Sequence, residues 1–134
     1  MVHQVLETAA RRFPEAIALR AGDAAWSFGQ LDAAAASFAR HLNGLGVRPG
    51  ERVAVMTTSR PEFVVAVNGI SRAGAAAVLL SPAWKEREVS AALELTAPAY
   101  AIVDAASGGL LQSLLDEQRV LDLDDTTALE AALG

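Results

Sequence analysis

Short apolar runs alternate with longer amphipathic stretches over most of this chain. The runs begin near residues 52, 76, 100 and 120, and apolar residues at helical spacing fill the stretches between them. The run at residues 76–80 is apolar at every position, which is typical of a strand covered on both faces. Strands that alternate with helices predict a βαβ series. We therefore expect an α/β fold, with a parallel sheet, right-handed crossovers and helices on both faces.

The N-terminal segment adds a helix and a small hairpin to this series. Apolar residues recur at helical spacing over residues 5–13, and Pro14 ends that helix because its ring cannot continue the backbone hydrogen bonds. Two short segments that favour strands then flank the turn at residues 21–23. This arrangement predicts an antiparallel hairpin before the parallel sheet.

Local signals predict where several helices begin and end. Ser27 with Gln30, and Ser59 with Glu62, have the spacing of a capping box, in which side chains bond to free backbone amides. Gly74 fits the left-handed position that follows a helix ending near residue 73. We expect the main helices over residues 28–45, 61–73, 85–95, 108–118 and 126–133.

Composition narrows the class of protein. The length of 134 residues suits a single domain, and a hydrophobic content of 52% allows a substantial core. The net charge is −5 and basic residues do not cluster, so we expect no nucleic-acid partner. The lack of cysteine excludes disulfides and thiolate metal sites and fits a cytoplasmic location. Neither a signal peptide nor an uninterrupted apolar run of about 18 residues is present, so we expect no transmembrane segment.

The common catalytic and phosphate-binding motifs are missing. No Gly-x-Gly-x-x-Gly follows a strand, no loop ends in Gly-Lys-Ser/Thr, and no nucleophile elbow is present. His3 and His41 have no second ligand at helical spacing, and we expect both at the surface. Asp122, Asp124 and Asp125 could hold a metal, but a solvated loop that caps a helix is the favoured interpretation. These patterns predict no catalytic residue and no metal site.

Two loops follow predicted strands at the edge where open α/β sheets bind ligands. The loop at residues 105–109 precedes a helix and could hold an anion, although an ordinary connection is favoured. The loop at residues 81–85 contains Trp84, which is either a platform for a flat ring or a cap on the core. It also contains Lys85, which either meets a phosphate or begins a solvated helix. Core or surface roles are favoured for both on the residue pattern alone.

Four segments carry a resemblance to a known family. They are residues 26–31 (Trp-Ser-Phe-Gly-Gln-Leu), residues 46–54 (Gly-Val-Arg-Pro-Gly-Glu-Arg-Val-Ala), residues 72–82 (Arg-Ala-Gly-Ala-Ala-Ala-Val-Leu-Leu-Ser-Pro) and residues 100–104 (Tyr-Ala-Ile-Val-Asp). In this order they resemble motifs of the adenylate-forming enzymes. That family includes acyl-CoA synthetases, the adenylation domains of peptide synthetases, and luciferases. The match covers nearly the whole chain.

The resemblance implies a reaction in two steps. A carboxylate attacks ATP to give an acyl adenylate and pyrophosphate, and a thiol, usually that of CoA, then displaces AMP. The full-length enzyme would use ATP, Mg and CoA with a carboxylic acid substrate, as in fatty acid metabolism. Our first hypothesis is therefore the N-terminal portion of a ligase that joins a fatty or other carboxylic acid to CoA.

The chain departs from the family pattern at two places. The Ser/Thr/Gly-rich phosphate loop and the motifs that follow it in the family are not among the 134 residues. Leu79 and Leu80 also stand where the family often has proline. We therefore expect residues 1–134 to form a single domain, the first part of the large domain of such a ligase, truncated before the phosphate loop. We expect it to be inactive by itself and to hold no cofactor tightly.

The resemblance carries over few site residues. In CoA ligases, the loop that corresponds to this part of the chain lies near the entrance used by the nucleotide part of CoA. The implied CoA-facing patch consists of Pro82, Ala83, Trp84 and Lys85. No catalytic residue is carried over.

Two alternatives remain open at this point. One is a non-catalytic binding or assembly module that reuses the fold. The apolar helix at residues 63–73 would then expose a patch that favours self-association. The other is part of an adenylation domain that loads a carrier protein instead of CoA.

Overall fold

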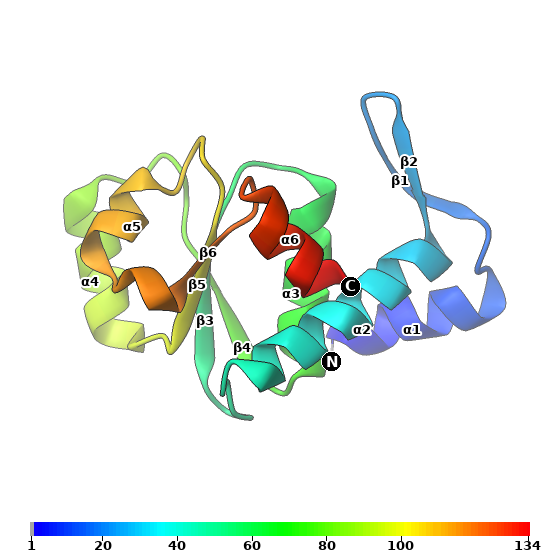
Figure 1. Ribbon diagram of the computed structural model, residues 1–134, viewed down its shortest axis with the longest axis horizontal. Helices are drawn as coiled ribbons and strands as arrows, with labels where there is room; N and C mark the ends of the chain where they lie inside the picture. The colour runs from blue at the N-terminus through cyan, green and yellow to red at the C-terminus, as the bar shows by residue number, and fades with distance from the viewer. Residues whose placement is uncertain (1) are drawn as a thin grey trace.

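The computed structural model describes residues 2–134 and is built around a four-stranded parallel sheet (Figure 1). The strands lie in the order β4-β3-β5-β6, and each neighbouring pair is parallel. This confirms the predicted βαβ series, because parallel neighbours need crossover connections and each connection here contains a helix. The strands are β3 (Arg52–Met56), β4 (Ala76–Leu79), β5 (Tyr100–Val103) and β6 (Val120–Asp122).

Helices cover both faces of this sheet, as predicted (Figure 1). The helices α4 and α5 lie over one face, α2, α3 and α6 lie over the other, and α1 packs on α2 and α3. Within residues 2–134, no helix has the length and apolar character that crossing a membrane requires. The helices are α1 (Val2–Arg12), α2 (Phe28–Gly44), α3 (Pro61–Arg72), α4 (Glu86–Thr96), α5 (Gly109–Leu114) and α6 (Thr126–Leu133), with a 3-10 turn η1 (Glu117–Arg119).

The core has one layer on each side of the sheet because successive strand residues point to opposite faces. Val53 and Val55 of β3 belong to the layer under α2 and α3, whereas Ala54 and Met56 belong to the layer under α4 and α5. All four side chains are at most 1% exposed. Two apolar layers thus fix the strand register and, with it, the carboxyl edge of the sheet.

The predicted hairpin is a separate antiparallel pair, β1 (Ile17–Ala21) and β2 (Ala24–Ser27), which projects from the helical layer in Figure 1. Gly22 has the φ of +58° that its tight turn requires. The predicted capping box of α2 is also confirmed. The Ser27 hydroxyl accepts from the Gln30 amide at 3.1 Å, and the Ser27 amide donates to Gln30 Oε1 at 2.8 Å.

The second predicted capping box, at Ser59, is wrong. Arg60 is the N-cap residue of α3, and its side chain makes no capping hydrogen bond to a backbone amide of the first turn. Pro61 occupies the first turn as predicted and has no amide hydrogen for a cap to satisfy. The Glu62 carboxylate, which a capping box would have used, accepts instead from Arg60 Nε at 2.7 Å.

The strand β4 differs from the prediction of a strand covered on both faces. It is one of the two edge strands of the sheet, and both of its end residues are exposed, Leu79 by 55%. An unbroken apolar run indicates that both faces of a strand are apolar, but it does not determine the position of the strand in the sheet. The turn before β4 is as predicted, since Gly74 has a φ of +81°.

The apolar helix α3 does not expose the patch that we expected. None of its residues is exposed, because α1, α2 and the strand β1 pack against it. Val65, Ala66 and Ile70 are 0% exposed. Self-association stays a prediction, but an exposed apolar face of α3 no longer supports it.

The helix predicted at residues 108–118 is shorter in the structure. The helix α5 ends at Leu114, Leu115 has extended backbone angles, and η1 follows. Arg119 fixes this turn, because its guanidinium donates to the carbonyl oxygens of Pro98 and Ala99. Leucine spacing predicted one longer helix because it contains no information about these bonds to a distant loop.

Candidate functional site

Three loops meet at the carboxyl edge of the sheet, where open α/β sheets bind ligands. They follow β3 (residues 57–60), β4 (residues 80–85) and β5 (residues 104–108). Because these strands are parallel and hydrogen-bonded in register, their loops leave the sheet on the same side. The loops form a pocket and a polar cluster that share Thr58.

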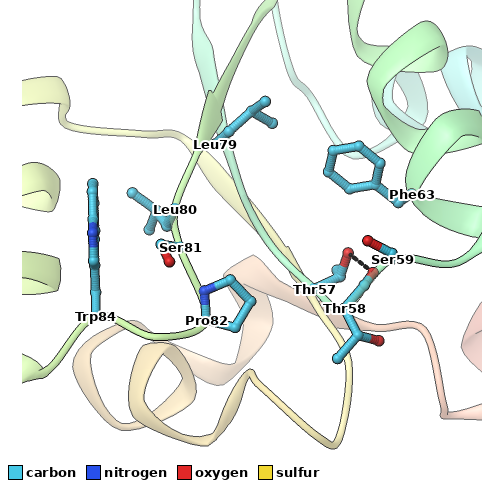
Figure 2. Close-up of a pocket in the computed structure, with 9 residues that line it drawn as sticks. All are labelled: Thr57, Thr58, Ser59, Phe63, Leu79, Leu80, Ser81, Pro82 and Trp84. Carbon is cyan, nitrogen blue, oxygen red and sulfur yellow. Dashed lines mark hydrogen bonds between the residues drawn. The ribbon is translucent and has the colours of Figure 1, made fainter.

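A pocket of about 350 Å³ lies between the loops that follow β3 and β4 (Figure 2). Trp84, which is 40% exposed, stands on one side of it, and Phe63 of α3 stands on the other. Aromatic side chains on opposite walls suit a flat apolar ring. The pocket is lined by Thr57, Thr58, Ser59, Phe63, Leu79, Leu80, Ser81, Pro82 and Trp84.

Hydroxyl groups form the polar part of the pocket. The Thr57 hydroxyl donates to the carbonyl oxygen of Thr58 at 3.0 Å, which leaves its oxygen able to accept. The Ser81 hydroxyl accepts from the Ala83 amide at 3.2 Å, which leaves its proton able to donate. A ligand with both donors and acceptors would find partners on two sides of the pocket.

The structure brings two of the four predicted CoA-facing residues into this pocket. Pro82 and Trp84 line it, whereas Ala83 and Lys85 do not. Lys85 stands just before α4, and its amide donates to the Glu88 carboxylate at 2.6 Å. The role of this loop in CoA binding stays a prediction.

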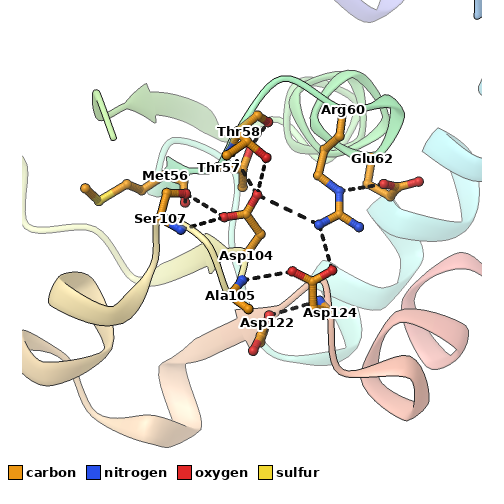
Figure 3. Close-up of polar contacts among 10 residues, drawn as sticks. All are labelled: Met56, Thr57, Thr58, Arg60, Glu62, Asp104, Ala105, Ser107, Asp122 and Asp124. Atoms are coloured by element: carbon orange, nitrogen blue, oxygen red, sulfur yellow. Dashed lines mark hydrogen bonds and ion pairs between the residues drawn. The ribbon is translucent and has the colours of Figure 1, made fainter. Parts of the chain in front are cut away.

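Asp104 is the centre of a polar cluster beside the pocket (Figure 3). Its side chain is 1% exposed and accepts hydrogen bonds with both oxygens. Oδ2 accepts from the amide and the hydroxyl of Thr58, at 2.9 and 2.6 Å. Oδ1 accepts from the amide and the hydroxyl of Ser107, at 3.0 and 2.5 Å. This one carboxylate therefore joins the loop after β3 to the loop after β5.

Arg60 supplies positive charge next to this carboxylate. Its Nη1 lies 3.8 Å from Asp104 Oδ2 and 2.9 Å from Asp124 Oδ1. Burial acts to lower the pKa of Arg60, but hydrogen bonds to Glu62 and Asp124 outweigh burial, so its pKa is raised. Figure 3 shows the guanidinium between the three carboxylates.

The two aspartates of the cluster are both ionised at neutral pH. Burial acts to raise the pKa of Asp104, yet the hydrogen bonds from Ser107 and Thr58 outweigh burial and lower the pKa to about 2. The pKa of Asp124 is also lowered, first by the amide of Ala105 and then by Arg60. In both cases the donors stabilise the charged form of the carboxylate.

The other candidate residues have structural partners. Asp125 caps α6 by accepting from the Ala128 amide at 3.2 Å, in agreement with the favoured interpretation of the acidic segment. His3 is half-buried instead of lying on the open surface, and its Nδ1 is 2.8 Å from Ser71 Oγ. The part of the chain that the structure describes holds no group of three or more side chains that could bind a metal ion.

Asp104 is the site residue that sequence reasoning missed. The available signal was an acidic residue directly after a buried strand, with the sequence Thr-Thr-Ser after the neighbouring strand. The structure argues against the possible anion site at residues 105–109. The amide and hydroxyl of Ser107 in this loop already donate to the Asp104 carboxylate. A second anion at this place would be repelled by the carboxylate.

Comparison with known proteins identifies the family. A family model described as AMP-binding enzyme matches residues 6–133. The chain belongs to this family of adenylate-forming enzymes. Malpinin synthetase of Mortierella alpina is 34% identical to it over 110 residues, which make up 82% of this chain and 1% of that protein. The salicyl-AMP ligase / salicyl-S-ArCP synthetase of Mycobacterium tuberculosis is 36% identical over 110 residues, 78% of this chain and 20% of that protein.

A solved structure of the family shares the fold closely. The apo structure of MbtA from Mycobacterium smegmatis matches this chain with a TM-score of 0.88 and 30% sequence identity. The match covers 98% of this chain and 27% of that one. The chain thus spans at most about a fifth of the two curated relatives and about a quarter of the solved protein.

Proposed function

We propose that this chain is the N-terminal part of an ATP-dependent ligase that converts a carboxylic acid into an acyl adenylate and then into a thioester. The match of the AMP-binding enzyme family over residues 6–133 is the observation that supports it. In the first step a carboxylate oxygen bonds to the α-phosphorus of ATP and pyrophosphate leaves. In the second step a thiolate sulfur bonds to the acyl carbon and AMP leaves.

The described residues do not by themselves fit a nucleotide triphosphate. The amide and hydroxyl of Ser107, which are donors in the loop before α5, are occupied by Asp104. Transfer at phosphorus needs positioned donors or cations that stabilise the developing negative charge. In such enzymes Mg²⁺ provides part of this stabilisation. We therefore propose that residues 1–134 alone are inactive and that the phosphate-binding groups belong to other parts of the enzyme.

CoA is the acceptor that the pocket supports best. Trp84 and Phe63 stand on opposite sides of a space that suits a flat heteroaromatic ring, and hydroxyls lie between them. The adenine of CoA has both a flat ring and groups that donate and accept hydrogen bonds. A fatty or other carboxylic acid is the substrate class that we propose with it.

A carrier protein is the second candidate acceptor. The relative from Mycobacterium tuberculosis is named a salicyl-S-ArCP synthetase, and it is 36% identical to this chain. If this chain serves a carrier protein, the pocket next to Trp84 has no adenine to bind. The two acceptors therefore make different predictions for the same pocket.

The proposed function is tested on the full-length protein that contains this chain. We expect exchange of labelled pyrophosphate into ATP that depends on a carboxylic acid, measured with a panel of fatty, aromatic and amino acids. The acceptor is then identified by comparing CoA with a carrier protein that bears its phosphopantetheine thiol. We expect the 134 residues alone to give no exchange above background. Acid-independent or absent exchange by the full-length protein would contradict the proposal.

Replacing Trp84 by alanine tests the pocket. Stacking of a base on an aromatic side chain contributes about 1–3 kcal/mol, so we expect the KM for CoA to rise about tenfold in Trp84→Ala. Acid-dependent pyrophosphate exchange should change by less than about twofold, because CoA takes no part in it. Leu95→Ala is the control, since Leu95 is an apolar side chain of α4 that is 85% exposed and does not line the pocket. An unchanged KM for CoA in Trp84→Ala would contradict the binding of CoA in this pocket.

A further inference from the structure

Asp104 lies next to the pocket but does not line it. Both of its oxygens accept hydrogen bonds, and its side chain is 1% exposed. A ligand in the pocket would therefore meet Thr58, not the carboxylate itself. Any influence of Asp104 on the pocket must pass through the residues that it holds.

The carboxylate holds the loop after β3 by two different groups of one residue. The bond to the Thr58 amide fixes the backbone, and the bond to the Thr58 hydroxyl fixes the side-chain rotamer. The neighbouring Thr57 hydroxyl donates to the Thr58 carbonyl oxygen, so its orientation depends on the backbone of the same residue. Thr57, Thr58 and Ser59 together form the polar wall of the pocket, facing the loop that contains Trp84 (Figure 2).

The same carboxylate is tied to the loop after β5, which gives it a rigid base. Ser107 donates to Asp104 by its amide and its hydroxyl, and that hydroxyl also lies 3.1 Å from the carbonyl oxygen of Met56, at the end of β3. Asp104 follows β5, which pairs with β3 at the centre of the sheet. The polar wall is thus fixed to the buried sheet through one ionised side chain (Figure 3).

The chemistry of these contacts requires a carboxylate. Every one of the four contacts is made by an N–H or O–H donor, and a carboxylate can accept at both oxygens. An asparagine in the same place has one accepting oxygen and would point its NH₂ group at donors. On that side the backbone amide of Thr58 or Ser107 would lose its acceptor, while the hydroxyl could rotate to accept from the NH₂ group.

We propose that Asp104 is a positioning residue, which sets the polar wall formed by Thr57, Thr58 and Ser59 and thereby the binding of CoA in the adjacent pocket. The acceptor part of this inference rests on the proposed function. The link between Asp104 and the wall rests on the geometry alone. The two parts are tested by separate measurements on the same variants.

The link to the wall is tested by hydrogen exchange in the full-length protein at pH 7. Because hydrogen bonds to a charged group are strong, we expect exchange at residues 57–60 to become at least about tenfold faster in Asp104→Asn. Leu42→Ala truncates a fully buried side chain of α2 that does not line the pocket, and is the control for a general loss of stability. If residues 57–60 loosen no more in Asp104→Asn than in this control, the link is overturned, whatever the outcome for the proposed function.

The effect on the acceptor is tested by steady-state kinetics of the same variants. We expect the KM for CoA to rise about tenfold in Asp104→Asn, which corresponds to the loss of about one such contact. Acid-dependent pyrophosphate exchange, which measures the first step, should fall by a clearly smaller factor than kcat/KM for CoA does. A purely structural role would reduce both steps together, as in Leu42→Ala. Equal losses in both steps, or an unchanged KM with a loosened wall, would overturn the role in acceptor binding.

Discussion

Replacing Gly108 by alanine is expected to destabilise the chain by about 3 kcal/mol, the upper part of the range for overpacking a filled site. Gly108 is buried, and a Cβ atom there would lie 2.7 Å from the carbonyl oxygen of Asp104 and would overlap the side chain of Val103. Neither neighbour can move freely. Val103 is 0% exposed in the core, and the Asp104 carbonyl already accepts from the Gly108 amide at 2.8 Å.

Gly109 provides a matched control at the next position. A Cβ atom on Gly109 would meet nothing within 4 Å, and the residue is exposed at the start of α5. We expect Gly109→Ala to leave stability unchanged or to raise it by up to about 1 kcal/mol, because alanine restricts the unfolded chain. Urea unfolding at 25 °C followed by circular dichroism measures both. Equal effects of the two substitutions would show that the backbone at Gly108 can shift to accommodate a Cβ atom with little loss of stability.

The layers of the fold could be predicted from the sequence because they depend on short-range patterns. Apolar runs and helical spacing indicate which segments are buried, and local residues such as Ser27 and Gly74 act within one turn of their own position. Two of the wrong predictions concern partners distant in the sequence, whereas the wrong capping box at Ser59 is a local error, since Arg60 is the N-cap residue and bonds to Glu62. Leu79 is exposed because of the order of the strands, and the segment after Leu114 leaves the helix where Arg119 bonds to another loop.

The candidate site could be predicted only in part from the sequence, again because some of its contacts join residues that are distant in the chain. The loop with Pro82 and Trp84 was found through a resemblance of motifs, and the structure brings these two residues to a pocket. Asp104 was not found, because its partner Thr58 is 46 positions away and the segment at residues 100–104 served only as a family motif, with no role for its aspartate. Parallel register brings the ends of β3 and β5 together, and only the register reveals that their polar residues meet.

Acid should weaken the fold through Asp104. The pKa of this carboxylate is about 2 in the folded chain, against 3.8 for the free group. A group with a lowered folded-state pKa contributes stability that is present above the unfolded pKa and is lost as pH falls through the folded one. Each unit corresponds to 1.36 kcal/mol, so Asp104 should contribute about 2 kcal/mol at pH 7 that disappears between about pH 5 and pH 2.

Asp104→Asn isolates this contribution from the other carboxylates of the chain. At pH 7 we expect the variant to be less stable than the wild type by about 3 kcal/mol, since the backbone amide of Thr58 or Ser107 loses its acceptor. The difference should shrink to below about 1 kcal/mol near pH 2, where Asp104 of the wild type is itself half protonated.

Urea titrations at each pH measure this difference in stability, with Asp23→Asn in the exposed hairpin turn as the control that should follow the wild type throughout. A difference that stays constant from pH 7 to pH 2 would mean that the size and shape of the amide, and not the charge of the carboxylate, set the cost. In that case the wall of the pocket would be held by packing, and its fixation would not depend on an ionised side chain.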